Sequence, residues 1–413
     1  MRLHDASTYS VPGLTWDLSS IIAPVPVDEF FRSYYHQTCL HLHNSLPKFA
    51  GLMPWSGLNY ILRHQRLDPP QLRLVKDGQP IPVESYIKSI QRRTTAIPKL
   101  LVSELAGHLR QGATLIIDKV DDMYEPIGSL ATALEGALGA EVGVNLYAGW
   151  RTSRGFDLHW DDHDVFILQV TGKKHWTVYA PTVNYPIRHS PETDTEKPTG
   201  DPIWQGFLEA GDLLYIPRGW WHVAVPCDEP TLHLTVGLTT VTALDLLNWV
   251  RARLGAEEFM RTDVPRFDDK RAQIRFLSFF RDAITAAICD KDLLPTFYRQ
   301  LQQNTEPRAA LGLPWTGTPD VIPPNGDTTI ELANAYPLDI RHSLDSGTIE
   351  VTFRNNVFTF HDAVTPLFEF LEASHTVSTA SFHDRFDDEF GHQELRTFIA
   401  DLVKGGILFL VDK

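Results

Sequence analysis

Cysteine is scarce in this sequence, and the few that occur are far apart. Cys39, Cys227 and Cys289 are the only three among 413 residues, and none belongs to a paired motif. A disulfide framework and a cysteine-based zinc site are therefore excluded. Unpaired thiols are typical of a reducing compartment, so we expect a cytoplasmic location.

Long apolar runs are missing as well. The chain opens with Met1-Arg2-Leu3-His4-Asp5, which lacks the apolar core of a signal peptide. No stretch approaches the roughly 20 apolar residues that a membrane span requires. We therefore expect no membrane association. The composition is otherwise that of a globular protein, and the length indicates two or three domains.

Positive charge is in deficit. The chain has 37 Lys and Arg against 52 Asp and Glu, which gives a formal net charge of -15. Nucleic-acid-binding surfaces have the opposite balance, because basic side chains neutralise phosphates. We expect no direct nucleic-acid binding. No internal repeat, Gly-rich phosphate loop or Ser-His-Asp signature stands out either.

Two separated blocks contain the residues best suited to chemistry. The first starts at His159-Trp160-Asp161 and continues into an apolar strand, and the second, residues 211–222, ends at His222. Residues i and i+2 of a strand point the same way, so His159 and Asp161 can grip one metal ion. We expect another strand of the same sheet to supply His222. Two histidines and one carboxylate form a facial triad that suits non-heme Fe(II) oxygenases.

The His-x-Asp pattern is a weak signal by itself. Its alternative interpretation is two satisfied core histidines and an aspartate in a turn, and only the second block favours the metal. His163 is the nearest competing ligand, but we interpret it as a structural or supporting residue because of its spacing from His159. His41 and His43 share a face of a predicted strand, but no third ligand lies near them in the sequence.

From about residue 140 to residue 240 the chain resembles the JmjC/cupin-type Fe(II)- and 2-oxoglutarate-dependent oxygenases. Within this family it is most similar to the ribosomal oxygenases, the cupin-4 group. The residues that carry the resemblance are His159-x-Asp161 with residues 164–169, then Gly172-Lys173-Lys174-His175-Trp176, and then residues 211–222.

The resemblance implies an α+β fold built on a double-stranded β-helix, a cupin or jelly-roll barrel of the JmjC type. It implies Fe(II) on His159, Asp161 and His222, with 2-oxoglutarate and O2 completing the coordination. In the family a basic residue at the position of Lys174 binds the distal carboxylate, which would be costly to bury unpaired. Lys173 alternates to the opposite face, where we expect solvent.

Two predicted strands supply further residues for the cosubstrate. Asn145 and Tyr147 alternate with apolar neighbours and would face the barrel lumen, where a small acid would bind. The alternative is a strand with one solvent-facing side. His233 and Thr235 share a face of the strand that closes the barrel. We expect Thr235 to border the cosubstrate, and for His233 a structural role is the alternative.

Composition and pattern divide the chain into four parts. Residues 1–240 are predicted to form the JmjC/cupin catalytic domain, in which a long polar insertion at 182–208 is typical of a lid or recognition loop. Amphipathic helices at 241–305 resemble the dimerisation region of ribosomal oxygenases and predict a homodimer. Residues 306–335 are predicted to be a linker, and residues 336–413 resemble a winged helix. Within these parts we expect individual helices at 127–138, 243–254 and 271–293, and a hairpin around Asn355-Asn356.

Winged helices often bind DNA, but the charge of this segment favours another role. From His361 to the end of the chain there are four basic and ten acidic residues. Phosphate contacts need the reverse balance. We therefore predict a scaffold or a protein contact.

The sequence as a whole predicts an oxygenase that hydroxylates a side chain of a protein or peptide, such as a ribosomal protein, and releases succinate and CO2. The substrate class follows from the resemblance alone. Two alternatives stay open: a peptide-tailoring hydroxylase that acts on a biosynthetic precursor peptide, and a non-catalytic metal-binding cupin that serves as an interaction module. Demethylation is disfavoured, because no chromatin-reading segment is visible.

Overall fold

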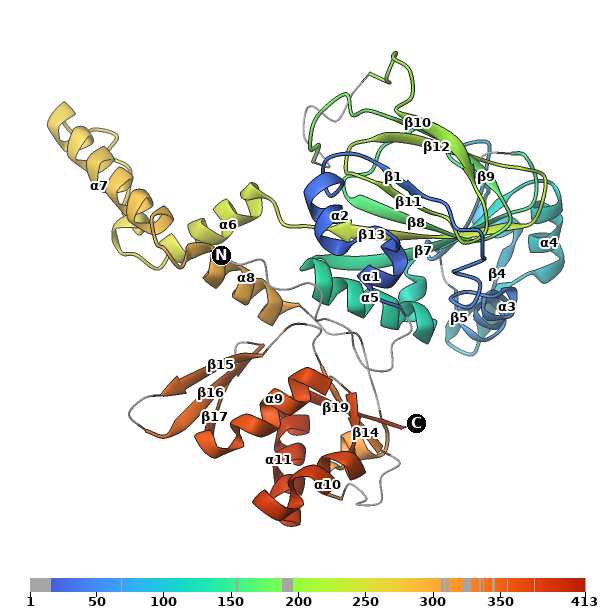
Figure 1. Ribbon diagram of the computed structural model, residues 1–413. Helices are drawn as coiled ribbons and strands as arrows, with labels where there is room; N and C mark the ends of the chain where they lie inside the picture. Colours follow the sequence, from blue (N-terminus) through green and yellow to red (C-terminus); the bar gives the residue numbers. More distant parts are fainter. Residues whose placement is uncertain are drawn as a thin grey trace. The chain divides into compact units, whose positions relative to one another are not determined.

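The chain forms two compact units, Met1–Thr239 and Thr240–Lys413, in a computed structural model (Figure 1). In the part of the chain that the structure describes, no helix has the length and apolar content needed to cross a bilayer. The described residues are 16–67, 69–153, 155–187, 196–305, 308, 312–321, 328–333, 336, 338–343, 346–354, 356–374 and 376–412.

Two antiparallel sheets make up most of the first unit (Figure 1). The larger has the strand order β1-β11-β8-β13-β7-β6-β2-β3, and the smaller has the order β10-β9-β12. The strands of the larger sheet are β1 Leu40–Leu42, β2 Leu72–Lys76, β3 Gln79–Pro80, β6 Thr114–Ile117, β7 Glu141–Gly149, β8 Asp164–Thr171, β11 Leu213–Ile216 and β13 Thr231–Thr239. Those of the smaller sheet are β9 Lys174–Tyr179, β10 Trp204–Leu208 and β12 Trp221–Pro226.

Strand β8 is covered on both faces, which explains its continuous apolar sequence. Alternate side chains of a strand point to opposite faces. Phe166 and Leu168 belong to the main core on the outer face of the larger sheet. Val165 and Ile167 instead pack with Trp176 of β9 in a second apolar cluster between the two sheets. That inner cluster keeps the space between the sheets largely apolar.

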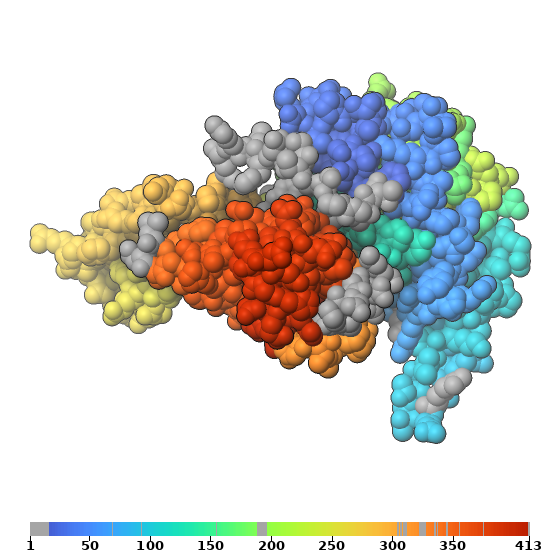
Figure 2. All heavy atoms as spheres, turned by 60° about the horizontal axis from the view of Figure 1, so that its bottom comes forward, coloured from blue at the N-terminus to red at the C-terminus, as the bar shows by residue number. Residues whose placement is uncertain are grey.

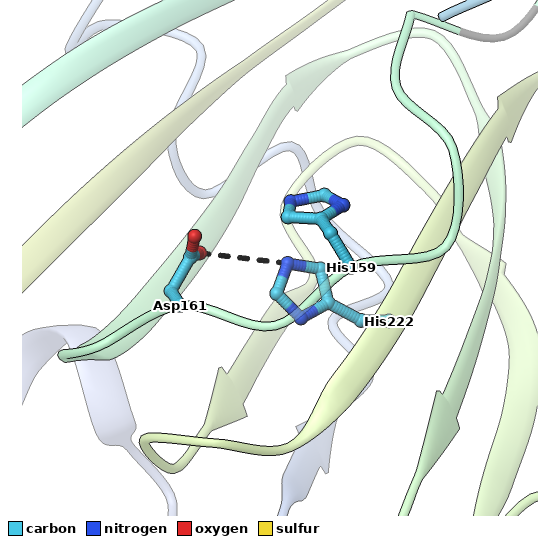
Figure 3. A group of neighbouring side chains, drawn as sticks. All are labelled: His159, Asp161 and His222. Carbon is cyan, nitrogen blue, oxygen red and sulfur yellow. Dashed lines mark ion pairs between the residues drawn. The ribbon is translucent and has the colours of Figure 1, made fainter. Parts of the chain in front are cut away.

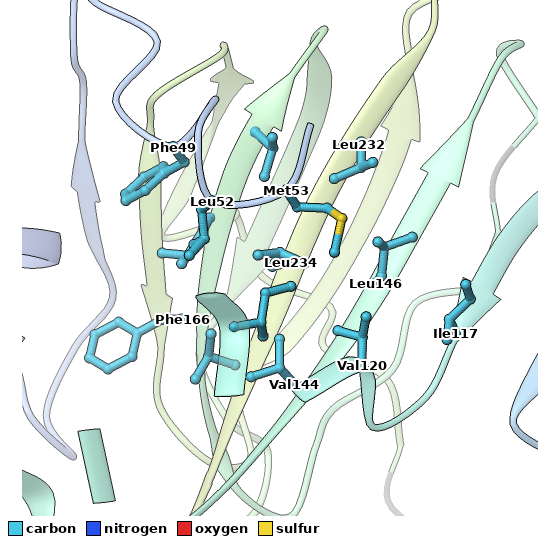
Figure 4. Close-up of a cluster of buried hydrophobic side chains, with 14 of the residues drawn as sticks. Phe49, Leu52, Met53, Ile117, Val120, Val144, Leu146, Phe166, Leu232 and Leu234 are labelled. Atoms are coloured by element: carbon cyan, nitrogen blue, oxygen red, sulfur yellow. The ribbon is translucent and has the colours of Figure 1, made fainter. Parts of the chain in front are cut away.

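The main core lies between the larger sheet and the segments that cover it. Figure 4 shows Phe49, Leu52 and Met53 over the strand residues Leu232 and Leu234. The predicted helix at 127–138 is confirmed as α5, Glu125–Leu138, and Gly139 ends it with a left-handed φ of 60°. The other helices of this unit are α1 Leu18–Ile22, α2 Val27–Ser33, α3 Trp55–His64 and α4 Val102–Arg110.

A two-stranded hairpin, β4 Ile87–Arg92 and β5 Thr95–Leu100, stands apart from both sheets. Figure 2 shows it as the light blue projection at the edge of the first unit. An isolated hairpin gains little stability by itself. Tyr86 and Ile87, which are 1% and 7% exposed, hold its base in the main core.

The second unit begins with helices and continues into a smaller core. Three helices, α9 to α11, pack with two three-stranded sheets, whose orders are β18-β14-β19 and β15-β16-β17. The helices of this unit are α6 Ala243–Leu254, α7 Lys270–Ile288, α8 Leu293–Asn304, α9 Thr365–Ser374, α10 Thr379–Phe390 and α11 His392–Lys404. Its strands are β14 Thr328–Leu332, β15 Asp339–Ser343, β16 Thr348–Phe353, β17 Asn356–His361, β18 Thr376–Ser378 and β19 Leu408–Asp412.

Three details differ from the sequence prediction. The polar insertion at 182–208 ends in β10, whose side chains alternate in burial. Residues 188–195 of the insertion, which include most of an acidic run at 192–196, lie outside the described residues. The helix expected at 271–293 is two helices, α7 and α8. The expected linker at 306–335 contains β14, the central strand of a sheet, because its buried Ile330 packs in the core of the second unit.

Two other predictions for the second unit agree with the structure. The helix expected at 243–254 is confirmed as α6, which begins with a capping box at Thr242. The hairpin expected around Asn355-Asn356 is confirmed by the pairing of β16 with β17. Asn355 itself lies outside the described residues.

His41 and His43 hold a buried carboxylate in the first unit. Asp212 is fully buried, and its oxygens accept hydrogen bonds from the backbone N–H groups of Asn44 and Glu209, both at 2.9 Å. His43 Nδ1 and His41 Nε2 lie 3.0 and 3.4 Å from the same carboxylate. The two histidines therefore support the start of β11, and among the described residues they do not belong to a group that could hold a metal ion.

Replacing Asp212 with alanine is expected to lower the free energy of unfolding of the protein by about 1–3 kcal/mol for each donor left unpaired, because the backbone N–H groups of Asn44 and Glu209 lose their acceptor. Urea denaturation measures the change. Asp228→Ala is the matched control, since this 58%-exposed carboxylate pairs with Arg151 at the surface and such pairs contribute less than about 1 kcal/mol. Equal losses in the two variants would contradict the structural role of Asp212.

Candidate metal centre

Three side chains selected by the sequence converge in the first unit: His159, Asp161 and His222 (Figure 3). One nitrogen from each imidazole and one carboxylate oxygen lie within 4.8 Å of one another. His222 Nε2 is 3.5 Å from Asp161 Oδ2, and the two imidazole centroids are 4.4 Å apart. Atoms this close can contact one cation simultaneously.

The backbone positions these side chains differently from the expectation. His159 and Asp161 do not lie in a strand of the larger sheet but in the irregular segment before β8, and His222 lies in β12 of the smaller sheet. His159 and His222 form an isolated antiparallel bridge, in which His222 N donates to His159 O at 2.7 Å. The expectation of one common sheet was wrong, because this bridge joins the irregular segment to β12.

The turn before His222 also fixes the backbone of Asp161. The N–H of Gly219 donates to Asp161 O at 2.9 Å. Gly219 has a φ of +82°, and a Cβ atom at this position would lie 2.5 Å from Pro186 Cδ. Only glycine fits this turn without displacing its neighbours.

Both imidazoles are oriented by backbone carbonyls. Asp157 O lies 2.8 Å from His159 Nδ1, and Trp220 O lies 3.0 Å from His222 Nδ1. A carbonyl only accepts, so each Nδ1 carries the hydrogen and each Nε2 keeps its lone pair. Metal-binding histidines typically have this arrangement. Burial, reinforced by the neighbouring His159, lowers the pKa of His222 to about 4, so the ring is neutral at pH 7.

Lys174 is a buried cation between the sheets. Its side chain is 4% exposed, and Nζ lies 3.1 Å from His233 Nδ1. Among the described residues, no carboxylate forms an ion pair with it, and burial lowers its pKa to about 7. Burial, together with Lys174, lowers the pKa of His233. Lys173, as expected, points the other way and pairs with Glu209 at 3.1 Å.

The other expected cosubstrate residues lie on paired positions of β7 and β13. Tyr147 is opposite His233, and their rings stack with centroids 4.9 Å apart. Asn145 is opposite Thr235, and its Oδ1 accepts from Lys119 N at 3.0 Å. The structure therefore brings Tyr147 against the His233 ring that contacts Lys174, and places Asn145 and Thr235 further along the same strands.

Trp176 was not selected as a site residue by the sequence analysis. It follows Lys174 by two positions on β9, and its ring lies 6.2 Å from the His222 ring and 5.6 Å from the His233 ring. Its buried Nε1–H has no hydrogen-bond partner among the described residues. Leaving such a donor unpaired costs about 1–3 kcal/mol. The strand period shared with Lys174 could have identified it.

His163 does not join the three converging side chains. Its ring lies against Gly237 of β13, where an added Cβ would come within 2.8 Å of it. Its Nδ1 is 3.1 Å from the carboxylate of the adjacent Asp162. His163 is thus a packing residue, in agreement with its spacing in the sequence.

A cavity of about 200 Å³ lies beside the turn that holds Asp161. Arg218 and Trp220 from this turn line it, together with His36 and Gln37. Tyr185, from the start of the polar insertion, borders the same cavity. Its lining of both polar and apolar side chains and its position next to the turn make it a candidate for binding part of a substrate.

Residues 124–246 match the model of the JmjC domain. The chain is 31% identical over 228 residues to the bifunctional lysine-specific demethylase and histidyl-hydroxylase NO66 of Dictyostelium discoideum, which covers 53% of this chain and 42% of that protein. It is 29% identical over 240 residues to ribosomal oxygenase 1 of Gallus gallus, covering 57% of this chain and 38% of the relative. The chain thus spans less than half the length of these curated relatives.

Solved structures of the ribosomal oxygenase YcfD from Escherichia coli resemble the whole chain. One superposes with a TM-score of 0.57 at 17% identity and covers 94% of this chain and 98% of YcfD. Another, with a TM-score of 0.56 and the same coverage and identity, is a complex of YcfD with cobalt and 2-oxoglutarate. At this identity the comparison establishes the fold, a JmjC cupin-type fold with mixed helices and sheets.

Proposed function

We propose that this chain, whose residues 124–246 form a JmjC domain, is an Fe(II)- and 2-oxoglutarate-dependent oxygenase that hydroxylates a protein or peptide side chain. The observation that carries the proposal is the convergence of His159, Asp161 and His222, with both Nδ1 atoms engaged by carbonyls. This donor set, two imidazoles and a carboxylate, suits Fe(II) and leaves coordination positions open.

The surroundings of the triad fit an elongated dicarboxylate. Lys174 would pair with the distal carboxylate of 2-oxoglutarate, and the unpartnered Nε1–H of Trp176 offers a second donor between the sheets. Burial raises the pKa of Tyr147, so its hydroxyl also stays a donor near neutral pH. Asn145 and Thr235 would border the same space. The cobalt and 2-oxoglutarate complex of YcfD supports this choice of metal and cosubstrate.

Bound Fe(II) and 2-oxoglutarate supply an oxidative decarboxylation, in which O2 is consumed, succinate and CO2 are released, and one oxygen atom enters a substrate C–H bond. The protein provides placement and exclusion of water. His222 stays neutral above about pH 4 because it is buried beside His159. The apolar cluster of Val165, Ile167 and Trp176 limits access of water to the space between the sheets.

A protein side chain is the substrate class that the relatives support. Their names record a bifunctional lysine-specific demethylase and histidyl-hydroxylase and a ribosomal oxygenase. We extend the hydroxylase class, with a ribosomal-protein-like substrate, to the present chain. The cavity beside Arg218 and Trp220, with its mixed polar and apolar lining, would accept part of such a peptide. The alternatives remain a peptide-tailoring hydroxylase and a non-catalytic cupin module.

Turnover without a protein substrate separates the oxygenase from the non-catalytic module. Purified protein is incubated with Fe(II), 2-oxoglutarate and O2, and succinate is measured by chromatography. We expect slow succinate formation that needs both Fe(II) and O2 and disappears in Asp161→Ala. Succinate at the level of a protein-free control would support the interaction module instead.

We also propose that the chain is a homodimer through residues 241–305. The sequence gives this region apolar stripes, and none of the 19 residues of α7 is buried. Phe267 is 91% exposed, and Ile274 and Leu277 are 65% and 61% exposed. An apolar surface of this kind is typical of an interaction site, and a second copy of the same helices would cover it.

Light scattering of the wild-type protein at micromolar concentration is expected to give the mass of a dimer. Ile274→Glu combined with Leu277→Glu should give a monomer, because it places charges in the apolar contact. Arg275→Glu, at an exposed polar position of the same helix, is the matched control and should stay dimeric. A monomeric wild-type protein would refute this part of the proposal.

For residues 336–413 we propose a winged-helix-like scaffold that contacts protein. Its three helices, α9 to α11, pack on strands β14, β18 and β19. Its acidic balance disfavours DNA. A cytoplasmic, reducing location stays a prediction, consistent with three free cysteines.

A further inference from the structure

Helices α10 and α11 bring together a second group of metal-ligating side chains, His383, Asp387 and His392. Within the described part of the chain it is the only such group besides the triad in the first unit. Its imidazole nitrogens and carboxylate oxygen also lie within 4.8 Å of one another. Neither the JmjC domain at 124–246 nor the proposed oxygenase reaction involves these residues.

The geometry of the helix corner explains why the three side chains meet. His383 and Asp387 are four positions apart on α10 and therefore lie on the same face. Gly391, with a φ of +85°, separates the two helices, and His392 is the first residue of α11. This turn brings His392 back over α10, where its ring centroid lies 4.2 Å from that of His383.

One carboxylate contacts both rings. His383 Nδ1 is 2.7 Å from Asp387 Oδ1, and His392 Nδ1 is 2.8 Å from Asp387 Oδ2. The side chain of His383 is only 7% exposed, whereas those of Asp387 and His392 are 36% and 43% exposed. The cluster is thus anchored on its inner side and reachable from solvent on its outer side.

We propose that His383, Asp387 and His392 form a zinc-binding site that ties α10 to α11. Two imidazoles and a carboxylate are common zinc ligands, with bonds of about 2.0–2.2 Å. Tetrahedral bonds of this length separate ligand atoms by about 3.3 Å, roughly half an ångström more than the present His–Asp distances. Small side-chain rotations provide this difference, and a water molecule would take the fourth position on the exposed side.

The chemistry of the site selects the class of metal. Imidazole nitrogen disfavours Mg²⁺ and Ca²⁺, which prefer oxygen ligands, and favours divalent transition metals. The exposed Asp384, Asp388 and Glu389 on α10 add negative charge nearby, which attracts a dication. A bound ion would replace two hydrogen bonds by coordinate bonds and would join the end of α10 to the start of α11.

The test uses full-length protein in which the triad is removed by His159→Ala and His222→Ala, so that it cannot bind the added metal. This metal-stripped protein is titrated with zinc chloride, and bound zinc is counted by mass spectrometry after desalting. We expect one zinc ion per chain and a higher thermal unfolding midpoint with zinc. The result does not depend on oxygenase activity, so it stands or falls separately from the proposed function.

Two additional substitutions in that background identify the ligands. Asp387→Asn and His392→Ala should each weaken zinc binding by more than about a hundredfold. Loss of a group that only supports a metal ligand already lowers metal affinity by about 10–100-fold, and loss of a ligand should lower it more. Both sites are partly exposed, so folding should persist, and circular dichroism checks it. His361→Ala is the control, because His361 is 74% exposed and pairs with a single carboxylate, Asp362.

The proposal is overturned if the zinc affinity of the triad-free protein is no higher than that of its His392→Ala variant. It is equally overturned if Asp387→Asn and His392→Ala leave the bound zinc unchanged. Loss of zinc in these two variants, with zinc retained in His361→Ala, supports it.

Discussion

Replacing His159, Asp161 or His222 with alanine is expected to reduce 2-oxoglutarate turnover more than a hundredfold. Loss of a residue that merely supports a metal ligand already costs about 10–100-fold, so loss of a ligand itself should cost more. The three ligand atoms lie within 4.8 Å of one another, and among the described residues no further carboxylate or imidazole belongs to this group and could replace a lost ligand. Succinate formation with saturating 2-oxoglutarate measures the effect.

His163→Ala is the matched control for these variants. It removes an imidazole four positions from His159 that packs against Gly237 and not on the triad. We expect its turnover to stay within a few-fold of wild type. Full activity in His159→Ala together with an inactive His163→Ala would show that the ligands were wrongly assigned. Iron content after desalting separates loss of metal from loss of chemistry.

Lys174→Ala is expected to raise the 2-oxoglutarate concentration needed for half-maximal turnover by a factor of about a hundred to a few thousand. Truncating one member of a buried charge pair costs about 3–5 kcal/mol. Each ~1.4 kcal/mol corresponds to a tenfold change in affinity. Iron affinity should change far less, because Lys174 contacts His233 and not the triad. Lys174→Arg should keep part of the activity, since a guanidinium also binds carboxylates with different reach.

Lys173→Ala supplies the control for this pair of neighbours. Lys173 is 37% exposed and pairs with Glu209 outside the space between the sheets. Its removal should leave the 2-oxoglutarate requirement almost unchanged, with Fe(II) saturating in every assay. Similar behaviour of the two alanine variants would mean that the cosubstrate does not lie beside Lys174.

The pH dependence of cosubstrate binding provides a second readout for Lys174. Its pKa of about 7 in the free protein means that it loses its proton as the pH rises through 7. A carboxylate favours the protonated form, so the apparent Kd of 2-oxoglutarate should increase above pH 7, by up to about tenfold per pH unit. In Lys174→Arg the cation stays charged, and this dependence should disappear.

The site could be predicted from the sequence to the extent that it depends on strand period and motif order. The two-residue spacing separated Lys174 from Lys173, and the two blocks identified His159, Asp161 and His222. The sequence did not reveal that His159 pairs with His222 across an irregular bridge, because bridges depend on contacts distant in the chain. The same strand period places Trp176 on the face of Lys174 and could have identified it, but the lack of a partner for its indole N–H becomes visible only when its surroundings are known.

The fold was predicted best where elements are long or strongly apolar. Helices α5 and α6 and the apolar strand β8 agree with the expectation, because periodicity and caps mark them. Short strands with polar neighbours were missed, as β10 and β14 show. The contact of His383, Asp387 and His392 was also invisible in the sequence, since it depends on how Gly391 turns one helix against the next.

The central claim is that this chain inserts one atom of O2 into a protein side chain while it converts 2-oxoglutarate to succinate. The most direct test is mass spectrometry of a ribosomal protein mixture after incubation with the enzyme, Fe(II), 2-oxoglutarate and isotopically labelled O2. We expect a peptide that gains one labelled oxygen atom, with at least one succinate formed for each modified peptide, and neither product with Asp161→Ala. Modification without 2-oxoglutarate, or oxygen drawn from water, would contradict it.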